Sequence, residues 1–163
     1  MDYSELKKII ESCHLNFLIG SGASRPFLDT LGTIEKMLTD LAEHSESEEK
    51  TVVDSSIKKH YFDVAIKGNL EINSGESESL AETKKAYSDF LASINCILTK
   101  RKSNLVSKQA NIFTTNMDLF LDYTLEEQHL VFNDGFYGRL NPVFGTDNFH
   151  NTIRKTSTHY EYQ

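Results

Sequence analysis

The stretch Asn16-Phe17-Leu18-Ile19-Gly20-Ser21-Gly22-Ala23-Ser24 decides the fold that we expect for this chain of 163 residues. Residues 16–19 favour a buried strand, which runs directly into a turn that contains two glycines. Glycine lets the backbone bend tightly and approach a ligand without a Cβ in the way. Backbone N–H groups in such a turn can converge on phosphate oxygens, and the serines add hydroxyl donors. The alternative is a strand-to-helix turn that holds no ligand.

A second polar segment follows a second expected strand. The strand is predicted at 112–115, and Asn116-Met117-Asp118 comes directly after it. Asn116 offers a donor and an acceptor without a charge, which suits ribose hydroxyls or a water molecule. Asp118 can equally cap the helix that we expect at 118–128. Ligands of parallel α/β sheets bind beyond the carboxyl ends of the strands, so we expect both segments at one edge.

The remaining pattern predicts alternating strands and helices. Apolar spacing predicts helices at 4–10, 33–44, 51–67 and 80–99, with Ser4 as the cap of the first, and further strands at 130–133 and 158–162. Residues from 134 onward, before the last strand, are expected to form a loop. This order indicates an α/β fold with a mostly parallel sheet. Polar runs at 45–50 and 73–79 mark a loop and helical insertion at about 45–79, after the first βα unit.

Composition excludes several functional classes. The net charge of −7 argues against strong direct binding of nucleic acid, although it leaves a local basic patch open. We find no apolar run long enough for a transmembrane helix and no signal peptide, and we therefore expect a cytoplasmic protein. The two cysteines, Cys13 and Cys96, are too few for a four-cysteine zinc site, and we expect no metal. We expect both to be reduced core residues, with a disulfide as the alternative.

Together, the Gly20–Ser24 turn and the Thr-Thr-Asn-x-Asp segment at 114–118 resemble the sirtuin superfamily. Segments 26–35 and 132–144 are similar to the sirtuin-like domains of bacterial anti-phage defence proteins, more than to protein deacetylases. The deacetylases' four-cysteine zinc ribbon is also missing from the sequence. The resemblance covers about 1–44 and 80–163. It implies a Rossmann-like three-layer fold, with 1–163 forming a single, partial NAD-binding domain.

The resemblance also implies a role for each matching residue. Asn116 would be the catalytic residue that contacts the nicotinamide ribose and the attacking water, and Asp118 would brace its loop. The implied reaction is NAD hydrolysis in antiviral defence, which cleaves the bond between nicotinamide and ribose and requires orientation and charge stabilisation. The residues implied in cofactor binding are Gly20, Ser21, Gly22, Ala23, Ser24, Thr115 and Asp118.

One feature of the family is missing. Its catalytic histidine lies in a His-Gly motif, but His150 is followed by Asn151 and His159 by Tyr160. We therefore expect the chain to end before its general base, with an incomplete sheet. The alternatives are a non-catalytic regulatory or partner-binding module and, less favoured, a protein deacylase. Expected partners are NAD, a second copy, or an ATPase or helicase-type defence protein.

The other polar candidates have simpler interpretations. A loop that contains Asp134, Arg139 and Asn141 would cover the cofactor, with turn formation as the alternative. His14 is expected to be partly buried. We expect exposed positions for His44, His60 and His129.

Overall fold

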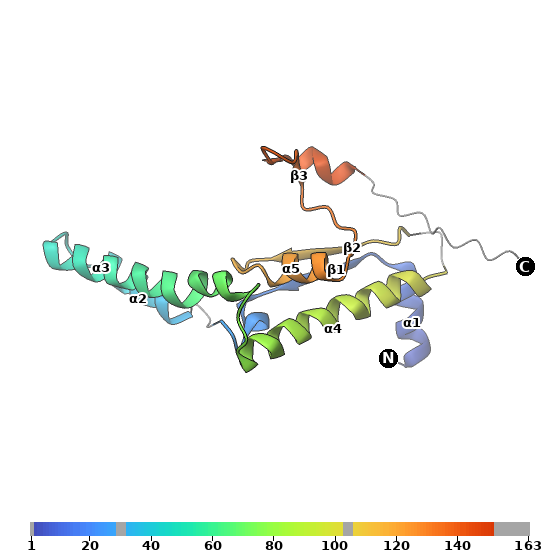
Figure 1. Cartoon of the computed structure of the whole chain (residues 1–163), viewed down its shortest axis with the longest axis horizontal. Helices are drawn as coiled ribbons and strands as arrows, with labels where there is room; N and C mark the ends of the chain where they lie inside the picture. The colour runs from blue at the N-terminus through green and yellow to red at the C-terminus, as the bar shows by residue number, and fades with distance from the viewer. Residues whose placement is uncertain (1, 29–31, 103–105, 152–163) are drawn as a thin grey trace, which may run out of the picture. The chain divides into compact units, whose positions relative to one another are not determined.

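The computed structural model describes residues 2–28, 32–102 and 106–151 (Figure 1). The chain divides into two compact units, Met1–Thr124 and Leu125–Gln163. Each unit is described by itself. Among the described residues, no helix is both long and apolar enough to cross a bilayer.

A parallel pair of strands organises the first unit. Strand β1 (Leu15–Ile19) pairs with β2 (Ala110–Thr114), with Leu15 opposite Ala110 and Ile19 opposite Thr114. Both strands predicted around the polar segments are confirmed, and so is their parallel orientation. The described residues therefore form an α/β arrangement with a small parallel sheet.

The two faces of this sheet differ. On one face, Phe17 packs edge-on against Phe90 of helix α4 (Glu78–Lys100), with ring centroids 5.3 Å apart. On the other face, the paired residues Leu18 and Phe113 are 78% and 58% exposed. A three-layer sheet has helices on both faces. Figure 1 shows α4 running along the pair of strands, and the exposure of Leu18 and Phe113 indicates that no helix of the described residues covers the other face at these positions.

The main core lies beside the end of β1. Tyr87 of α4 stacks on Phe120, the first residue of helix α5 (Phe120–Glu127), with ring centroids 5.4 Å apart. Phe27 packs edge-on against Phe120 at 5.7 Å, and Leu28 and Leu80 complete the cluster with Ile72. Buried aromatic pairs contribute about 0.5–1.5 kcal/mol beyond their area burial. This cluster fixes the segment after the glycine turn against α4 and the start of α5.

In the described ranges, five α-helices lie near their predicted positions. Helix α1 (Tyr3–Ser12) begins earlier than predicted because Asp2, not Ser4, is its cap, with Glu5 completing a capping box. Helix α2 spans Gly32–Ala42. Helix α3 (Glu48–Tyr61) is capped by Ser47, whose hydroxyl accepts the Lys50 N–H. It continues as the π-turn η2 (Phe62–Ile66) and the 3-10 turn η3 (Lys67–Glu71). The expected insertion is therefore mostly helical.

The second unit differs from prediction. Residues 130–133 form no strand, because no neighbouring strand pairs with them. The expected loop contains instead a short antiparallel hairpin, β3 (Phe136–Tyr137) and β4 (Val143–Phe144), followed by the 3-10 turn η4 (Thr146–His150). Contacts from Phe136 to Phe144 and from Phe144 to Phe149 stabilise it. The strand predicted at 158–162 lies outside the described residues.

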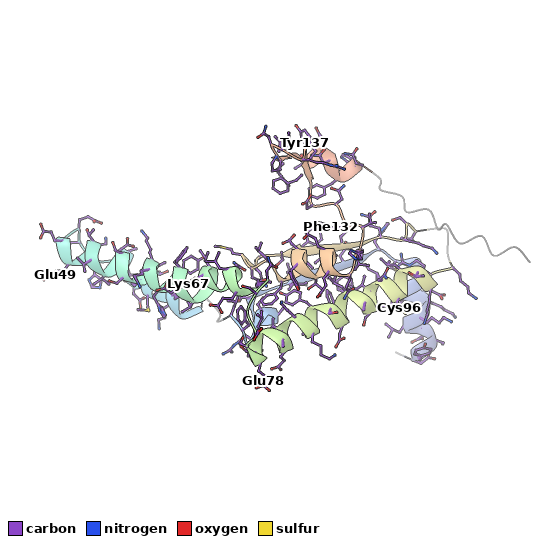
Figure 2. All side chains as sticks on the ribbon, viewed as in Figure 1. Glu49, Lys67, Glu78, Cys96, Phe132 and Tyr137 are labelled. Atoms are coloured by element: carbon purple, nitrogen blue, oxygen red, sulfur yellow. The ribbon has the colours of Figure 1, made fainter. Side chains whose placement is uncertain are left out.

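The expectation that both cysteines are core residues is wrong. Cys13 and Cys96 are exposed and free, and Figure 2 shows Cys96 on α4. The reason lies in the helical spacing. The buried positions of α4 follow one stripe through Tyr87, Leu91 and Ile94, and Cys96 is off that stripe. His14 is also exposed, contrary to expectation, whereas the other three histidines assigned to the surface are exposed as predicted.

Candidate functional site

The polar segments that follow β1 and β2 lie side by side. The turn after β1 is the 3-10 turn η1 (Ser21–Ser24), and the Asn116 side-chain nitrogen, Nδ2, donates to the Gly20 carbonyl at 3.2 Å. The parallel register explains this contact, because Ile19 pairs with Thr114 and the Thr115 N–H donates to the Ile19 carbonyl. The predicted proximity of the two segments is therefore confirmed.

A buried serine connects these segments to a third. Ser24 is 1% exposed, and its Oγ donates to Asp118 Oδ2 at 2.5 Å. Ser24 Oγ also lies 3.0 Å from the Tyr87 hydroxyl and 3.2 Å from Asn116 Nδ2. Because the serine has one hydrogen and gives it to the carboxylate, the Tyr87 hydroxyl must donate to Ser24. A hydroxyl this buried positions its neighbours and is not accessible as a nucleophile.

Tyr87 belongs to the site, although sequence reasoning did not identify this residue as functional. Burial raises the pKa of its phenol above the ordinary value of 10.0, and the nearby Asp118 carboxylate acts in the same direction. The phenol therefore remains a hydrogen-bond donor at neutral pH. Its position on the apolar stripe of α4 predicted only a core residue. The available signal was the hydroxyl itself, because a buried tyrosine usually has a polar partner.

Asn116 has one atom without a partner. Its side-chain oxygen, Oδ1, is buried and accepts no hydrogen bond from the described residues. The amide cannot be turned over, because the Gly20 carbonyl can only accept and so requires the nitrogen. A buried acceptor left unpaired costs about 1–3 kcal/mol. A ligand hydroxyl or a bound water would supply the missing donor.

Asp118 performs the capping role and the bracing role together. Oδ1 accepts the Phe120 N–H at 3.2 Å, at the beginning of α5, while Oδ2 accepts from Ser24. Each carboxylate oxygen thus has a separate donor. The alternative that Asp118 only caps the helix is too narrow, because the same side chain fixes Ser24.

The insertion supports the loop between Asn116 and α5. Asn69 of η3 donates from Nδ2 to the Met117 carbonyl at 3.1 Å and accepts the Leu119 N–H at 3.0 Å. The Tyr61 hydroxyl donates to the sulfur of Met117 at 2.9 Å. Sequence reasoning missed Asn69, because a single asparagine in a polar insertion carries no pattern.

The two glycines of the turn face open space. A Cβ built on Gly20 or Gly22 would meet no atom within 4 Å, and neither residue has a positive φ. Neither packing nor backbone conformation therefore requires glycine here. Both glycines are exposed, which leaves room for a ligand to approach the backbone closely. The hydroxyl–amide network around Ser24 includes neither the Ser21 side chain nor Ala23.

The remaining candidate residues lie in the second unit. Asp134 Oδ1 accepts the Phe136 N–H at 2.9 Å, which is the turn role weighed above, and Arg139 and Asn141 are exposed beside the hairpin. His150 ends η4, and His159 lies outside the described residues. Among the described residues, no group of three or more His, Cys, Asp or Glu side chains is arranged to hold a metal. No family model matches the sequence, and no curated protein matches it.

Proposed function

We propose that the Gly20–Ser24 turn and Asn116 bind NAD, and that this chain is the NAD-binding part of a sirtuin-like NAD hydrolase with a Rossmann-like fold. The supporting observation is the hydrogen bond from Asn116 Nδ2 to the Gly20 carbonyl. It joins the two segments on which the sirtuin resemblance rests, at the carboxyl edge of a parallel pair of strands. That edge is where α/β sheets bind their ligands.

Within this proposal the residues have distinct roles. The pyrophosphate approaches the open side of Gly20 and Gly22, where no side chain intervenes. The unpaired Oδ1 of Asn116 accepts a hydrogen bond from a ribose hydroxyl or from the attacking water. Ser24, Tyr87 and Asp118 hold the Asn116 amide in place and touch no substrate. In the reaction, the bond between nicotinamide and ribose breaks, and water supplies the hydroxyl of the ADP-ribose product.

Isothermal titration with NAD and ADP-ribose tests the binding step. The change is Asn116→Ala, which removes the amide at the site. The matched control is Asn111→Ala, because Asn111 bonds Asn16 across the sheet and is not part of the site. We expect Asn116→Ala to weaken binding by about tenfold or more, as for loss of a well-formed polar contact, and Asn111→Ala to leave it unchanged. If the folded wild-type protein binds neither compound, the proposal fails.

Measuring nicotinamide release tests the hydrolytic step. Release that Asn116→Ala reduces supports the hydrolase. Binding without release, alone and with added partner, supports the alternative of a regulatory or partner-binding module. An antiviral role, a cytoplasmic location, and assembly with a second copy or an ATPase-type protein belong to the same proposal. NAD-dependent loss of acetyl groups from a peptide would instead support a deacylase.

A further inference from the structure

A basic cleft lies at the other end of α4 from Tyr87. It has a volume of about 750 Å³ and is lined by residues of α1, of the C-terminal end of α4 and of the segment that follows α4. Among the described residues, five cations and one carboxylate line it: Lys7, Lys100, Arg101, Lys102, Lys108 and Glu11. The chain as a whole carries a net charge of −7. The overall composition therefore does not explain why positive residues gather in this cleft.

The lysines of the cleft lack acidic partners. Among the described residues, ion pairs form at Lys50, Lys58 and Lys59, and also at Lys85, all on α3 and α4 outside the cleft. None involves a lysine of the cleft. Lys108 Nζ has a neutral acceptor, the Thr99 carbonyl, at 3.4 Å. Like charges that gather around one cleft repel one another and attract an anion.

Arg101 gives an independent indication. It is 2% exposed, and its two terminal nitrogens donate to three backbone carbonyls, those of Ser107, Ile10 and Cys13. Its third nitrogen, Nε, is buried and has no partner in the part of the chain that the structure describes. The Ile10 and Cys13 carbonyls, at the C-terminal end of α1, carry partial negative charge and offset the guanidinium in part. A buried cation with only neutral partners still lacks a counterion.

We propose that this cleft binds a small anion with several phosphate groups, of the size of a nucleoside diphosphate or triphosphate. Lysine ammonium groups bind phosphates as point charges, and the buried guanidinium of Arg101 adds a fixed positive charge to the lining. The volume lies within the range of about 300–1,000 Å³ typical of small-molecule sites. A ligand with a single carboxylate group would leave most of these cations without a negative partner. A long nucleic acid is disfavoured, because its phosphates outside the cleft would meet a chain whose net charge is −7.

The cleft is separate from the proposed NAD site. At 1.5 Å per residue, the part of α4 from Tyr87 to Lys100 is about 20 Å long. Cys13 and Lys108 also precede β1 and β2, so that the cleft lies at the amino edge of the strands, opposite Gly20 and Asn116. The inference therefore does not depend on the proposed function.

Isothermal titration of the whole chain with inorganic triphosphate tests the proposal. The change is Lys7→Glu, and the matched control is Lys8→Glu, because Lys8 is the next residue of α1 and does not line the cleft. Circular dichroism shows whether both variants fold. We expect Lys7→Glu to weaken binding by about tenfold or more and Lys8→Glu by about twofold or less. Lys108→Glu repeats the test from the segment before β2, and wild-type affinity falls as salt rises.

Three results would overturn the proposal. One is no binding of triphosphate to the folded wild-type protein. Another is an equal loss of affinity in the Lys7 and Lys8 variants, which would indicate diffuse surface charge. The third is binding of a single-stranded oligonucleotide without binding of triphosphate, ADP or ATP. Asn116→Ala separates the two sites, because it weakens NAD binding under the proposed function and leaves triphosphate binding unchanged.

Discussion

Ser24 and Asp118 lie 94 positions apart in the chain, and Ser24 Oγ donates to Asp118 Oδ2 at 2.5 Å. The other carboxylate oxygen accepts the Phe120 N–H at the beginning of α5. One side chain thus joins the turn after β1 to the loop after β2 and to the following helix. The carboxylate is needed because both contacts require an acceptor.

Asp118→Asn tests this double use. An asparagine has one acceptor oxygen, so that either Ser24 or the Phe120 N–H must face an NH₂ group. We expect the free energy of unfolding to fall by about 1–3 kcal/mol, the cost of an unpaired buried group. Urea denaturation measures it. Asp89→Asn is the control, because it removes an exposed ion pair with Lys85 and should cost about 1 kcal/mol or less. Equal losses in both variants would contradict the role of Asp118.

Tyr87→Phe separates the hydroxyl from the ring. The ring stacks on Phe120 and is retained in phenylalanine, whereas the hydroxyl bond to Ser24 is lost. We expect a loss of about 1 kcal/mol in the free energy of unfolding for Tyr87→Phe, and about 3–5 kcal/mol for Tyr87→Ala. Urea denaturation of the two variants measures both. A Phe variant as unstable as the Ala variant would show that the ring stack contributes little.

The same tyrosine predicts a dependence on alkaline pH. Burial raises the pKa of the Tyr87 phenol above 10.0, so the folded protein holds this proton more tightly than the unfolded chain does. The resulting stability is fully present below the unfolded pKa and is lost as pH rises through the folded pKa. The advantage of wild type over Tyr87→Phe should therefore be constant up to about pH 10 and shrink above it. Urea denaturation at a series of pH values gives the difference, in which the other titrating groups cancel. A constant difference would contradict the raised pKa.

The sequence predicted the elements that local patterns determine. The strand at 16–19, the strand at 112–115 and the stripe of α4 were found because apolar spacing is a local signal. The proximity of the segment at 114–118 to the Gly20–Ser24 turn was also predicted, because parallel strands bring their carboxyl ends to one edge. Tyr87 and Asn69 were missed because their roles arise from contacts with distant residues. Residues 130–133 have the composition of a strand, but a strand also needs a partner, and composition does not supply one.

The exposed cysteines allow a chemical check of the fold. Cys13 follows α1 and Cys96 lies off the buried stripe of α4, and both are free. We expect both thiols of the folded protein to react with a disulfide reagent without denaturant, because access and thiolate formation control the rate. The absorbance of the thiol released from the reagent gives the number of protein thiols that have reacted. Cys13→Ser and Cys96→Ser should each remove one equivalent. A thiol that reacts only after unfolding would show that its side chain is buried.

The Gly22→Ala variant distinguishes an effect on the stability of the fold from an effect on binding of the proposed ligand. The added methyl group meets no atom within 4 Å, and the φ of Gly22 is not positive, so the folded state accommodates alanine. Because alanine restricts the unfolded chain, we expect stability to be unchanged or to rise by up to about 1 kcal/mol. The control is Gly75→Ala, where the new Cβ would lie 2.8 Å from the Glu71 carbonyl oxygen and must displace it. That variant should lose stability in the same urea denaturation.

The two variants should rank in the opposite order for NAD binding, with Gly22→Ala the more affected. If the NAD pyrophosphate approaches the open side of the turn, the methyl group of Gly22→Ala occupies its path. Because polar contacts to the backbone are then lost, NAD affinity should fall by about tenfold or more. Gly75→Ala, studied at a temperature where it is folded, should bind NAD as wild type does, because Gly75 lies outside the site. Isothermal titration of both variants gives the comparison. A stable Gly22→Ala protein with wild-type NAD affinity would place the pyrophosphate elsewhere, and the glycines of the turn would then be free of any role in binding.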